Sequence, residues 1–453
     1  MKHVLSALLL CTAFLPLSVR AEAPGSYASA SAADSLVASS ADSVYQHEQL
    51  KQERGYAMEG VTDAIGAVID QICLNKDFMH RPALVPHRSG NVADYAVAAS
   101  PLAATWIMKA AGVKSRSSTR RLLVSNALAL GLAGGLTEAL KHTTSQPRPD
   151  FSDNHTFPSG HTALAFVGAS VLHREYGYIS PWVSLSGYAV ASLTEALRVR
   201  HYAHWTSDLS MGSAVGLMSA NLAYFITDRI LPEKDVNRVG WTERNRLLRE
   251  HINDRPSGFT VTDFTESGER DIASQNLLSF SPGTVYSLRC SDAVSTGADL
   301  AYFFTDNFAA EGLFRYTQSL VKVCADDPAL SFTGGHLNGC HYDLAFRAQA
   351  PLWVPSFLGF LYRILPPTLM SARILAGGRT LSALNLGQVA ADGIVTPFCQ
   401  LPSQTSFELG GGIGFDFIAG PRFTTGIFVD YYHAFSHVLT DRYAIGSTWK
   451  VVF

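Results

Sequence analysis

The chain has 453 residues, of which 16% are charged and 47% are hydrophobic, and its formal net charge is −3. A chain of this length holds about two or three domains. The apolar content excludes a disordered protein, and the lack of an excess of basic residues excludes a typical nucleic-acid-binding protein. We therefore expect a folded protein with no nucleic-acid partner.

The first 21 residues have the order of a secretory signal peptide. Lys2 and His3 form a short basic segment, residues 4–17 are apolar, and Ala21 offers a small residue for cleavage before Glu22. The apolar run is shorter than the ~20 residues of a membrane-spanning helix. We predict an exported bacterial protein, in which disulfides are permitted.

Four regions of different composition follow the signal peptide (1–21). Residues 22–60 are rich in Ala and Ser, which indicates a flexible lead-in. Residues 61–230 carry weakly apolar stretches with helical spacing, and residues 231–280 are crowded with charges. Residues 281–453 alternate in short runs separated by turn residues. The predicted order is a helical domain, a charged linker and a β domain.

The helical region raises the question of a membrane. Its uncharged runs 122–137, 176–194 and 209–227 approach the length of a membrane-spanning helix. They are nevertheless rich in Ser, Thr and Gly, with few blocks of Leu, Ile or Phe. We favour a compact domain whose central helices are buried on all sides, and a bilayer-spanning bundle remains the alternative.

Chemically active side chains gather in three clusters of the helical region. They supply cations, donors, imidazoles and a carboxylate: Lys141, Arg148, Ser159, Gly160, His161, Arg198, His204 and Asp208. Two Arg and one Lys suit a buried tetrahedral oxyanion, because a guanidinium binds two oxygens and an ammonium adds a point charge. The sequence Pro158-Ser159-Gly160 predicts a helix start, where free N–H groups favour an anion.

The histidines can supply nucleophilic and acid catalysis. His204 and Asp208 are four residues apart and would share one face of a helix. The carboxylate can hold one ring nitrogen as N–H and leave the other free to attack. His161 is then available as the acid for the leaving oxygen. One such His–Asp pair is usually structural, but this much buried charge would be costly without an anion to bind.

These motifs resemble the type-2 phosphatidic acid phosphatase superfamily, which includes bacterial acid phosphatases, lipid phosphate phosphatases and vanadium haloperoxidases. The pattern is Lys-x6-Arg-Pro, then Pro-Ser-Gly-His, then Arg-x5-His-x3-Asp, within residues 95–230. One departure is Leu197, where the family usually has Ser before the Arg. The resemblance implies an all-α phosphatase core and hydrolysis of a phosphomonoester through a phosphohistidine, with no metal and no other cofactor.

The resemblance also implies a role for each matching residue. Phosphate would be bound by Lys141, Arg148, Ser159, Gly160 and Arg198. His204 would be the nucleophile, Asp208 its orienting group, and His161 the acid.

The C-terminal region predicts eight antiparallel strands. They are expected at 284–290, 297–304, 309–318, 342–349, 371–381, 407–417, 423–431 and 443–453. Each is apolar on one face and polar on the other, with short turns at 305–307 and 419–421 and long loops at 319–341 and 382–404. This resembles an outer-membrane β-barrel ending in an aromatic residue, and a soluble β-sandwich is the alternative. The long apolar connection 351–370 does not fit the barrel pattern.

The whole sequence therefore predicts an α+β multidomain protein, with a helical phosphatase core followed by an antiparallel eight-stranded β-barrel. We expect the barrel to lie in the outer membrane and the catalytic domain in the periplasm. The expected substrate is a phosphorylated lipid, and the first candidate is the 1-phosphate of lipid A. Phosphatidylglycerophosphate, phosphatidate and undecaprenyl pyrophosphate are alternative substrates. A vanadium-dependent haloperoxidase and a non-enzymatic barrel are the alternative functions.

Overall fold

The computed structural model describes residues 60–68 and 92–231 of the helical part. In the C-terminal part it describes residues 259–262, 270–274, 276–280, 283–287, 293–305, 307–321, 331–332, 335–352, 368–389, 394–420, 423–436 and 441–452. The predicted signal peptide, the lead-in up to residue 59 and most of the predicted linker lie outside the described residues.

Residues 60–68 and five longer segments are helical: α4 (Val92–Ala110), α5 (Thr119–Thr144), α6 (Gly160–Tyr176), α7 (Pro181–Arg200) and α8 (Thr206–Ile230). Three of these helices have a serine as the N-cap residue. Ser118, Ser159 and Ser180 each accept a hydrogen bond from a backbone N–H in the first turn of α5, α6 and α7. The helix start expected at Ser159 and Gly160 is therefore confirmed.

Helix α6 lies at the centre of the helical part and contacts α4, α5, α7 and α8. Two glycines allow α8 to approach it closely. A methyl group at Gly212 would come within 2.7 Å of the Ser159 carbonyl oxygen, and one at Gly216 within 2.5 Å of the Ala163 carbonyl oxygen. The close approach brings the N-terminal ends of α6 and α8 together.

Helices α5 and α8 are long and apolar enough to cross a membrane, by length and composition. In α8, 67% of the apolar window is buried in the protein, whereas α5 buries 33% of its window. Leu123 and Leu130 of α5 are exposed. The expectation that the central helices are buried on all sides is therefore wrong for α5.

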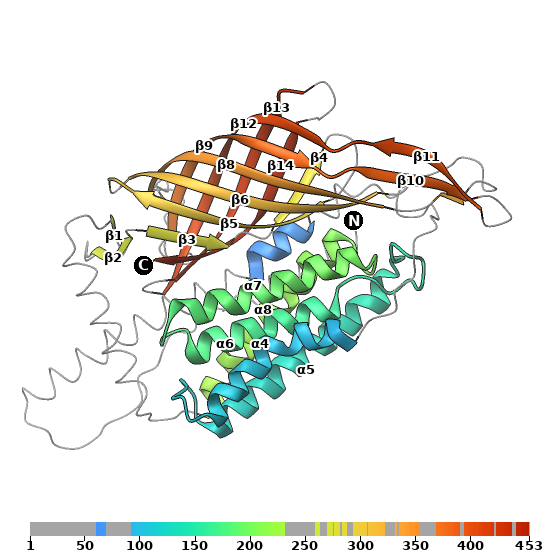
Figure 1. Ribbon diagram of the computed structural model, residues 1–453. Coiled ribbons are helices and arrows are strands. Elements are labelled where there is room, and N and C mark those ends of the chain that lie inside the picture. The colour runs from blue at the N-terminus through green and yellow to red at the C-terminus, as the bar shows by residue number, and fades with distance from the viewer. Residues whose placement is uncertain are drawn as a thin grey trace, which may run out of the picture.

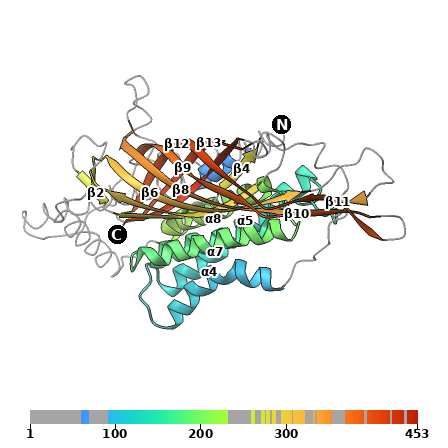
Figure 2. The same ribbon diagram turned by 45° about the horizontal axis from the view of Figure 1, so that its top comes forward.

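The C-terminal part is a curled antiparallel sheet, which Figures 1 and 2 show from two sides. Its strands are β3 (Asn276–Phe280), β4 (Gly283–Ser287), β5 (Ala293–Phe303), β6 (Phe308–Val321), β8 (Gly335–Pro351), β9 (Thr368–Leu381), β12 (Gln404–Gly420), β13 (Phe423–Ala434) and β14 (Arg442–Val452). Each of the eight ranges expected to be strands overlaps one of these.

The strand order is β13-β12-β9-β8-β6-β5-β3-β14-β4, with further pairings of β13 with β14 and of β5 with β4. Both β3 and β4 therefore lie between β5 and β14. Strand β13 also pairs with β14, and Tyr431 lies opposite Tyr443 in this ladder.

Shorter strands form two separate small sheets. Strands β1 (Phe259–Thr262) and β2 (Arg270–Ser274) pair with each other. Strands β7 (Ser331–Phe332), β10 (Leu384–Val389) and β11 (Val395–Leu401) form a three-stranded sheet. These last three lie in the ranges 319–341 and 382–404, which we expected to be loops, so that expectation is wrong in part. Backbone pairing explains the difference, because β10 has partners on both sides.

The curled sheet is polar inside and apolar outside. Its buried side chains include ion pairs between Arg315 and Asp430 (2.8 Å), between Arg347 and Glu311 (2.7 Å), and between Arg442 and Glu408 (2.8 Å). Large exposed apolar side chains alternate with them along the strands: Leu300, Tyr302, Phe314, Leu344, Phe346, Ile374, Phe407, Leu409 and Ile413. A soluble sandwich places its apolar face inward, so the polarity of this curled sheet is inverted relative to a soluble sandwich.

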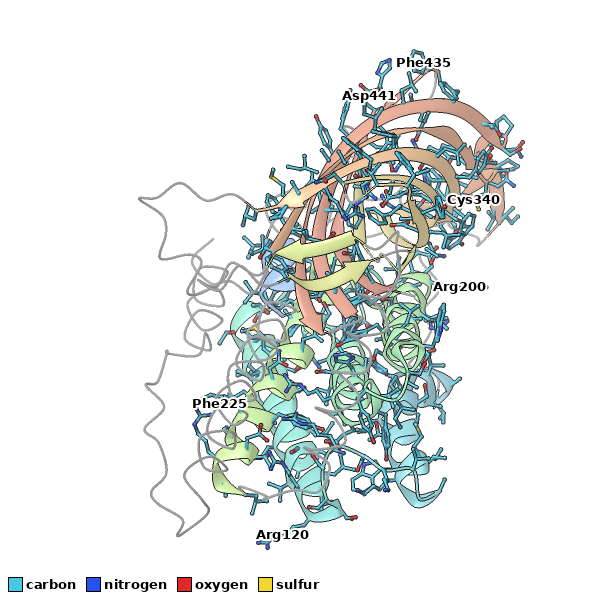
Figure 3. The ribbon with its side chains drawn as sticks, turned by 90° about the vertical axis from the view of Figure 1, so that its left-hand side faces the viewer. Arg120, Arg200, Phe225, Cys340, Phe435 and Asp441 are labelled. Atoms are coloured by element: carbon cyan, nitrogen blue, oxygen red, sulfur yellow. The ribbon has the colours of Figure 1, made fainter. Side chains whose placement is uncertain are left out.

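The helical part covers one side of the curled sheet. Helix α7 contacts β5, β6 and β14, and the helices lie along the sheet in Figure 1. Trp449 of β14 packs against Phe166 and Tyr188 of the helices and is 1% exposed. In Figure 3, Arg120 in α5 lies at the far end of the molecule from Phe435 and Asp441 beyond β13.

Candidate active site

Four helix ends meet where the three sequence clusters come together. Helices α5 and α7 end there, and helices α6 and α8 begin there. The Ser159 N–H donates to the Asp208 carbonyl oxygen (2.9 Å), which ties the starts of α6 and α8 together. Arg148 Nη1 donates to the Ala203 carbonyl oxygen (3.1 Å) and ties the segment after α5 to the segment before α8.

His204 is 4% exposed and lies just before α8, not within it. Its Nδ1 lies 3.5 Å from Oδ2 of Asp208 in the first turn of α8. The Thr156 hydroxyl is closer to both groups, at 3.1 Å from His204 Nδ1 and 2.6 Å from Asp208 Oδ2. The expected shared helical face is therefore wrong, although the expected His–Asp proximity is found.

Asp208 is fully buried and accepts hydrogen bonds from two further donors. Its Oδ2 accepts from the Trp205 N–H (2.8 Å), and its Oδ1 accepts from Gln146 Nε2 (3.1 Å). Burial raises the pKa of Asp208 to about 7, while the hydrogen bonds from Thr156 and Trp205 oppose the rise. The carboxylate is thus fixed in position and titrates near neutral pH.

The pKa of His204 lies well below its usual value. Burial is the largest cause, and the positive charges of Arg148, Arg198 and Lys141 add to it. The structure therefore brings all three predicted cations close enough to act on His204. At neutral pH the ring is uncharged, which a nitrogen nucleophile requires.

Arg198 lies near the end of α7 and is 3% exposed. Its Nη1 forms a 2.6 Å ion pair with Oδ2 of Asp94, which belongs to α4, and His201 Nδ1 lies 2.8 Å from the same oxygen. Among the described side chains, Arg198 Nε is buried without a hydrogen-bond partner. Asp94 therefore balances the charge of this guanidinium and orients it.

The other two cations keep partial access to solvent. Arg148 Nε donates to Asp153 Oδ2 (2.8 Å), and Lys141 Nζ lies 3.3 Å from Glu138 Oε1. A methyl group added at Gly160 would lie 4.0 Å from Lys141 Nζ. The ammonium group is thus beside the first turn of α6, where free backbone N–H groups add to its attraction for an anion.

Ser159 and His161 lie on either side of Gly160. Ser159 is fully buried, and its hydroxyl accepts from the Thr162 hydroxyl (3.0 Å). Nε2 of His161 is buried without a hydrogen-bond partner among the described residues. The centroid of the His161 ring lies 3.9 Å from the centroid of the Tyr95 ring. Burial, Arg198 and His204 lower the pKa of His161 to about 3.

All eight predicted residues lie around this meeting point, and sequence reasoning missed three others. Thr156 and Gln146 contact Asp208 from inside the motif region, and both are ordinary polar residues in the sequence. Asp94 lies 104 positions from its partner Arg198. No sequence spacing could have identified that contact.

Within the described residues, no group of three His, Cys, Asp or Glu side chains could hold a metal ion.

Comparison with known proteins gives the following matches. A curated lipid A 1-phosphatase from Porphyromonas gingivalis is 45% identical over 131 residues, which are 29% of this chain and 29% of that protein. The chain thus aligns with less than a third of that relative's length. Residues 122–231 match the PAP2 superfamily.

Among solved structures, Neisserial surface protein A (NspA) and the outer membrane enzyme PagL each match 39% of the chain, over 96% and 99% of their own lengths. They are 13% and 12% identical, with TM-scores of 0.23 and 0.22. From the site geometry and the sequence match together, residues 122–231 are a PAP2 superfamily domain.

Proposed function

We propose that this protein is a metal-independent phosphatase that removes a phosphomonoester from a membrane lipid. The observation that carries the proposal is the environment of His204. Its imidazole is uncharged, its Nδ1 lies within hydrogen-bond distance of the Thr156 hydroxyl, and the cations Lys141, Arg148 and Arg198 surround it. Such a site binds a phosphate group and presents a nucleophilic nitrogen to its phosphorus atom.

In the proposed reaction His204 Nε2 attacks phosphorus, and the P–O bond to the lipid breaks. The leaving oxygen takes a proton from His161. Water then attacks the phosphohistidine, His161 accepts its proton, and the P–N bond breaks to release phosphate. Burial is the largest cause of the low pKa of His161, and the charges of Arg198 and His204 lower it further. A phosphate dianion bound beside Arg198 raises this pKa again, so His161 takes up its catalytic proton with the substrate.

The roles of the remaining residues follow from their positions. Lys141, Arg148 and Arg198 bind the phosphate oxygens, with the Ser159 hydroxyl and the Gly160 N–H as further donors. Asp208 orients His204 and stabilises the positive charge that develops on its ring.

We propose that the substrate is lipid A and that its 1-phosphate is removed. Two observations support this: the 45% identity to a lipid A 1-phosphatase over 131 residues, and the inverted polarity of the C-terminal sheet. Phosphatidylglycerophosphate, phosphatidate and undecaprenyl pyrophosphate carry the same reacting group and are the competing substrates.

We further propose that the curled sheet is an eight-stranded outer-membrane barrel, with β3 and β4 acting as one interrupted strand. The pairings of β13 with β14, and of β3 and β4 with both β14 and β5, support closure. Trp449 lies near the end of β14 that pairs with Phe423 at the start of β13, next to the short turn expected at 419–421. Because short turns face the periplasm in such barrels, this contact supports a periplasmic catalytic domain (61–230) after a cleaved signal peptide (1–21). The helices would replace lipid along that side of the barrel.

The test is phosphate release by the full chain in detergent with EDTA present. Lipid A, phosphatidylglycerophosphate and phosphatidate are compared for the wild type, His204→Ala and the control His142→Ala. His142 contacts His155 and has no proposed role. We expect release from lipid A that His204→Ala reduces by at least about 10³-fold and His142→Ala leaves unchanged. Release from another lipid alone would overturn the lipid A assignment, and full activity of His204→Ala would overturn the mechanism.

A further inference from the structure

Thr156 lies between the two residues that the mechanism couples. Its hydroxyl oxygen is 2.6 Å from Asp208 Oδ2 and 3.1 Å from His204 Nδ1. The direct distance from His204 Nδ1 to Asp208 Oδ2 is 3.5 Å, beyond the usual range for a hydrogen bond of this kind. The imidazole and the carboxylate are therefore connected best through the threonine hydroxyl.

The distances determine the direction of the two hydrogen bonds. A threonine hydroxyl has one proton to donate and two lone pairs to accept with. Its nearest acceptor is Asp208 Oδ2, whereas the Ala203 carbonyl oxygen is 3.4 Å away. When Asp208 is ionised, the proton therefore points at Asp208, and the hydroxyl accepts from a protonated Nδ1 of His204. That tautomer leaves the Nε2 lone pair free.

The hydroxyl is also held rigidly. Thr156 is fully buried, and its backbone N–H donates to the Gln146 carbonyl oxygen (3.2 Å). The Gln146 side chain in turn donates to the other carboxylate oxygen of Asp208 (3.1 Å). Thr156, Gln146 and Asp208 thus form a closed ring of contacts, which limits how far the hydroxyl can move from His204.

We propose that Thr156 is a positioning residue, whose hydroxyl relays the effect of Asp208 to His204 and fixes the tautomer in which Nε2 attacks. The inference rests on the proposed function, since the attack is that of a phosphatase. The relay itself is a property of the ground state and can be measured without turnover.

The test compares Thr156→Val, which keeps the shape and removes the hydroxyl, with Thr156→Ser, which keeps the hydroxyl. The matched control is Thr227→Val, because Thr227 is a buried threonine near the C-terminal end of α8 whose hydroxyl donates to the Ala223 carbonyl oxygen (2.7 Å). All are measured as full chains in detergent. We expect Thr156→Val to lower kcat about 10- to 100-fold with KM within about twofold, and Thr156→Ser to restore kcat to within about threefold. The control keeps wild-type kcat.

The second readout is the tautomer of His204, read from side-chain nitrogen shifts in protein labelled at histidine with ¹⁵N. His204→Gln identifies the signal. We expect Nδ1–H in the wild type and in Thr156→Ser, and a mixture with Nε2–H in Thr156→Val. An unchanged tautomer and kcat in Thr156→Val would overturn the relay, as would a loss of kcat that Thr156→Ser does not recover. If the wild type releases no phosphate but shows the expected tautomers, the proposed function fails and the relay stands.

Discussion

Trp449 of the last strand stacks on Tyr188 of α7, with ring centroids 4.7 Å apart and planes inclined by 8°. Phe166 of α6 lies 5.6 Å from the same indole. The end of the curled sheet is thus part of the hydrophobic core of the helical part. The two parts of the chain share one core at this contact.

Removing that indole tests the shared core. Trp449→Ala leaves a large cavity between α6, α7 and β14, and we expect it to lower the free energy of unfolding by about 3–5 kcal/mol. Trp182→Ala is the matched control, because Trp182 on α7 is 49% exposed and its removal should cost under about 1 kcal/mol. Thermal unfolding followed by circular dichroism measures both. Equal effects of the two substitutions would contradict the shared core.

Asp63 links the helical residues 60–68 to the sheet by accepting a hydrogen bond from the Ser447 hydroxyl. Burial raises the pKa of this carboxyl to about 6 from 3.8. A raised pKa in the folded state means that the group favours folding most below pH 3.8, and that this advantage is lost as the pH rises through 6.

We therefore expect Asp63→Asn to be more stable than the wild type at pH 8, by on the order of 2 kcal/mol, and equal to it near pH 4. The amide oxygen can still accept from Ser447. Thermal melts at the two pH values provide the measurement, and Asp150→Asn, at a surface carboxylate that bonds Ser152, serves as the control. A stability difference that does not change between pH 4 and pH 8 would count against a buried titrating carboxyl.

Asp94 is the counter-charge of the buried Arg198. Asp94→Asn leaves that guanidinium without its negative partner, and we expect a loss of about 3 kcal/mol in stability. Inorganic phosphate should restore part of it, since a bound anion replaces the missing charge. The measurement is Tm with and without phosphate. Asp153→Asn, at the exposed partner of Arg148, should lose less. If phosphate raises Tm no more in Asp94→Asn than in the wild type, Arg198 does not bind phosphate.

The pH dependence of kcat/KM should report Asp208. Its pKa is raised to about 7 by burial, and the ionised form is the one that orients His204. We expect kcat/KM of the wild type to fall as the pH decreases below about 7. Asp208→Asn should be about 10²- to 10⁴-fold slower and should lack this acid limb. An acid limb that persists in Asp208→Asn would assign it to another group.

Local sequence patterns predict several secondary-structure elements of this protein and the residues of its candidate site. The alternation of apolar and polar residues over 407–417 predicted β12, because side chains of a strand point alternately to its two faces. Pro158-Ser159-Gly160 predicted the start of α6, because a serine hydroxyl satisfies a free N–H of the first turn. The motif spacings likewise predicted the set of polar groups that meet at the site.

Contacts between distant segments were decided by the tertiary structure alone. Asp94 and Arg198 are 104 positions apart, and Asp63 and Ser447 are 384 positions apart. Thr156 is near the motif in sequence, but only the packing of α6 against α8 places its hydroxyl between His204 and Asp208. Residue types and spacing determine which groups can bind and attack a phosphate. The relative positions of the helices decide which neighbours hold those groups, because side-chain contacts of this kind depend on distance in space and not along the chain.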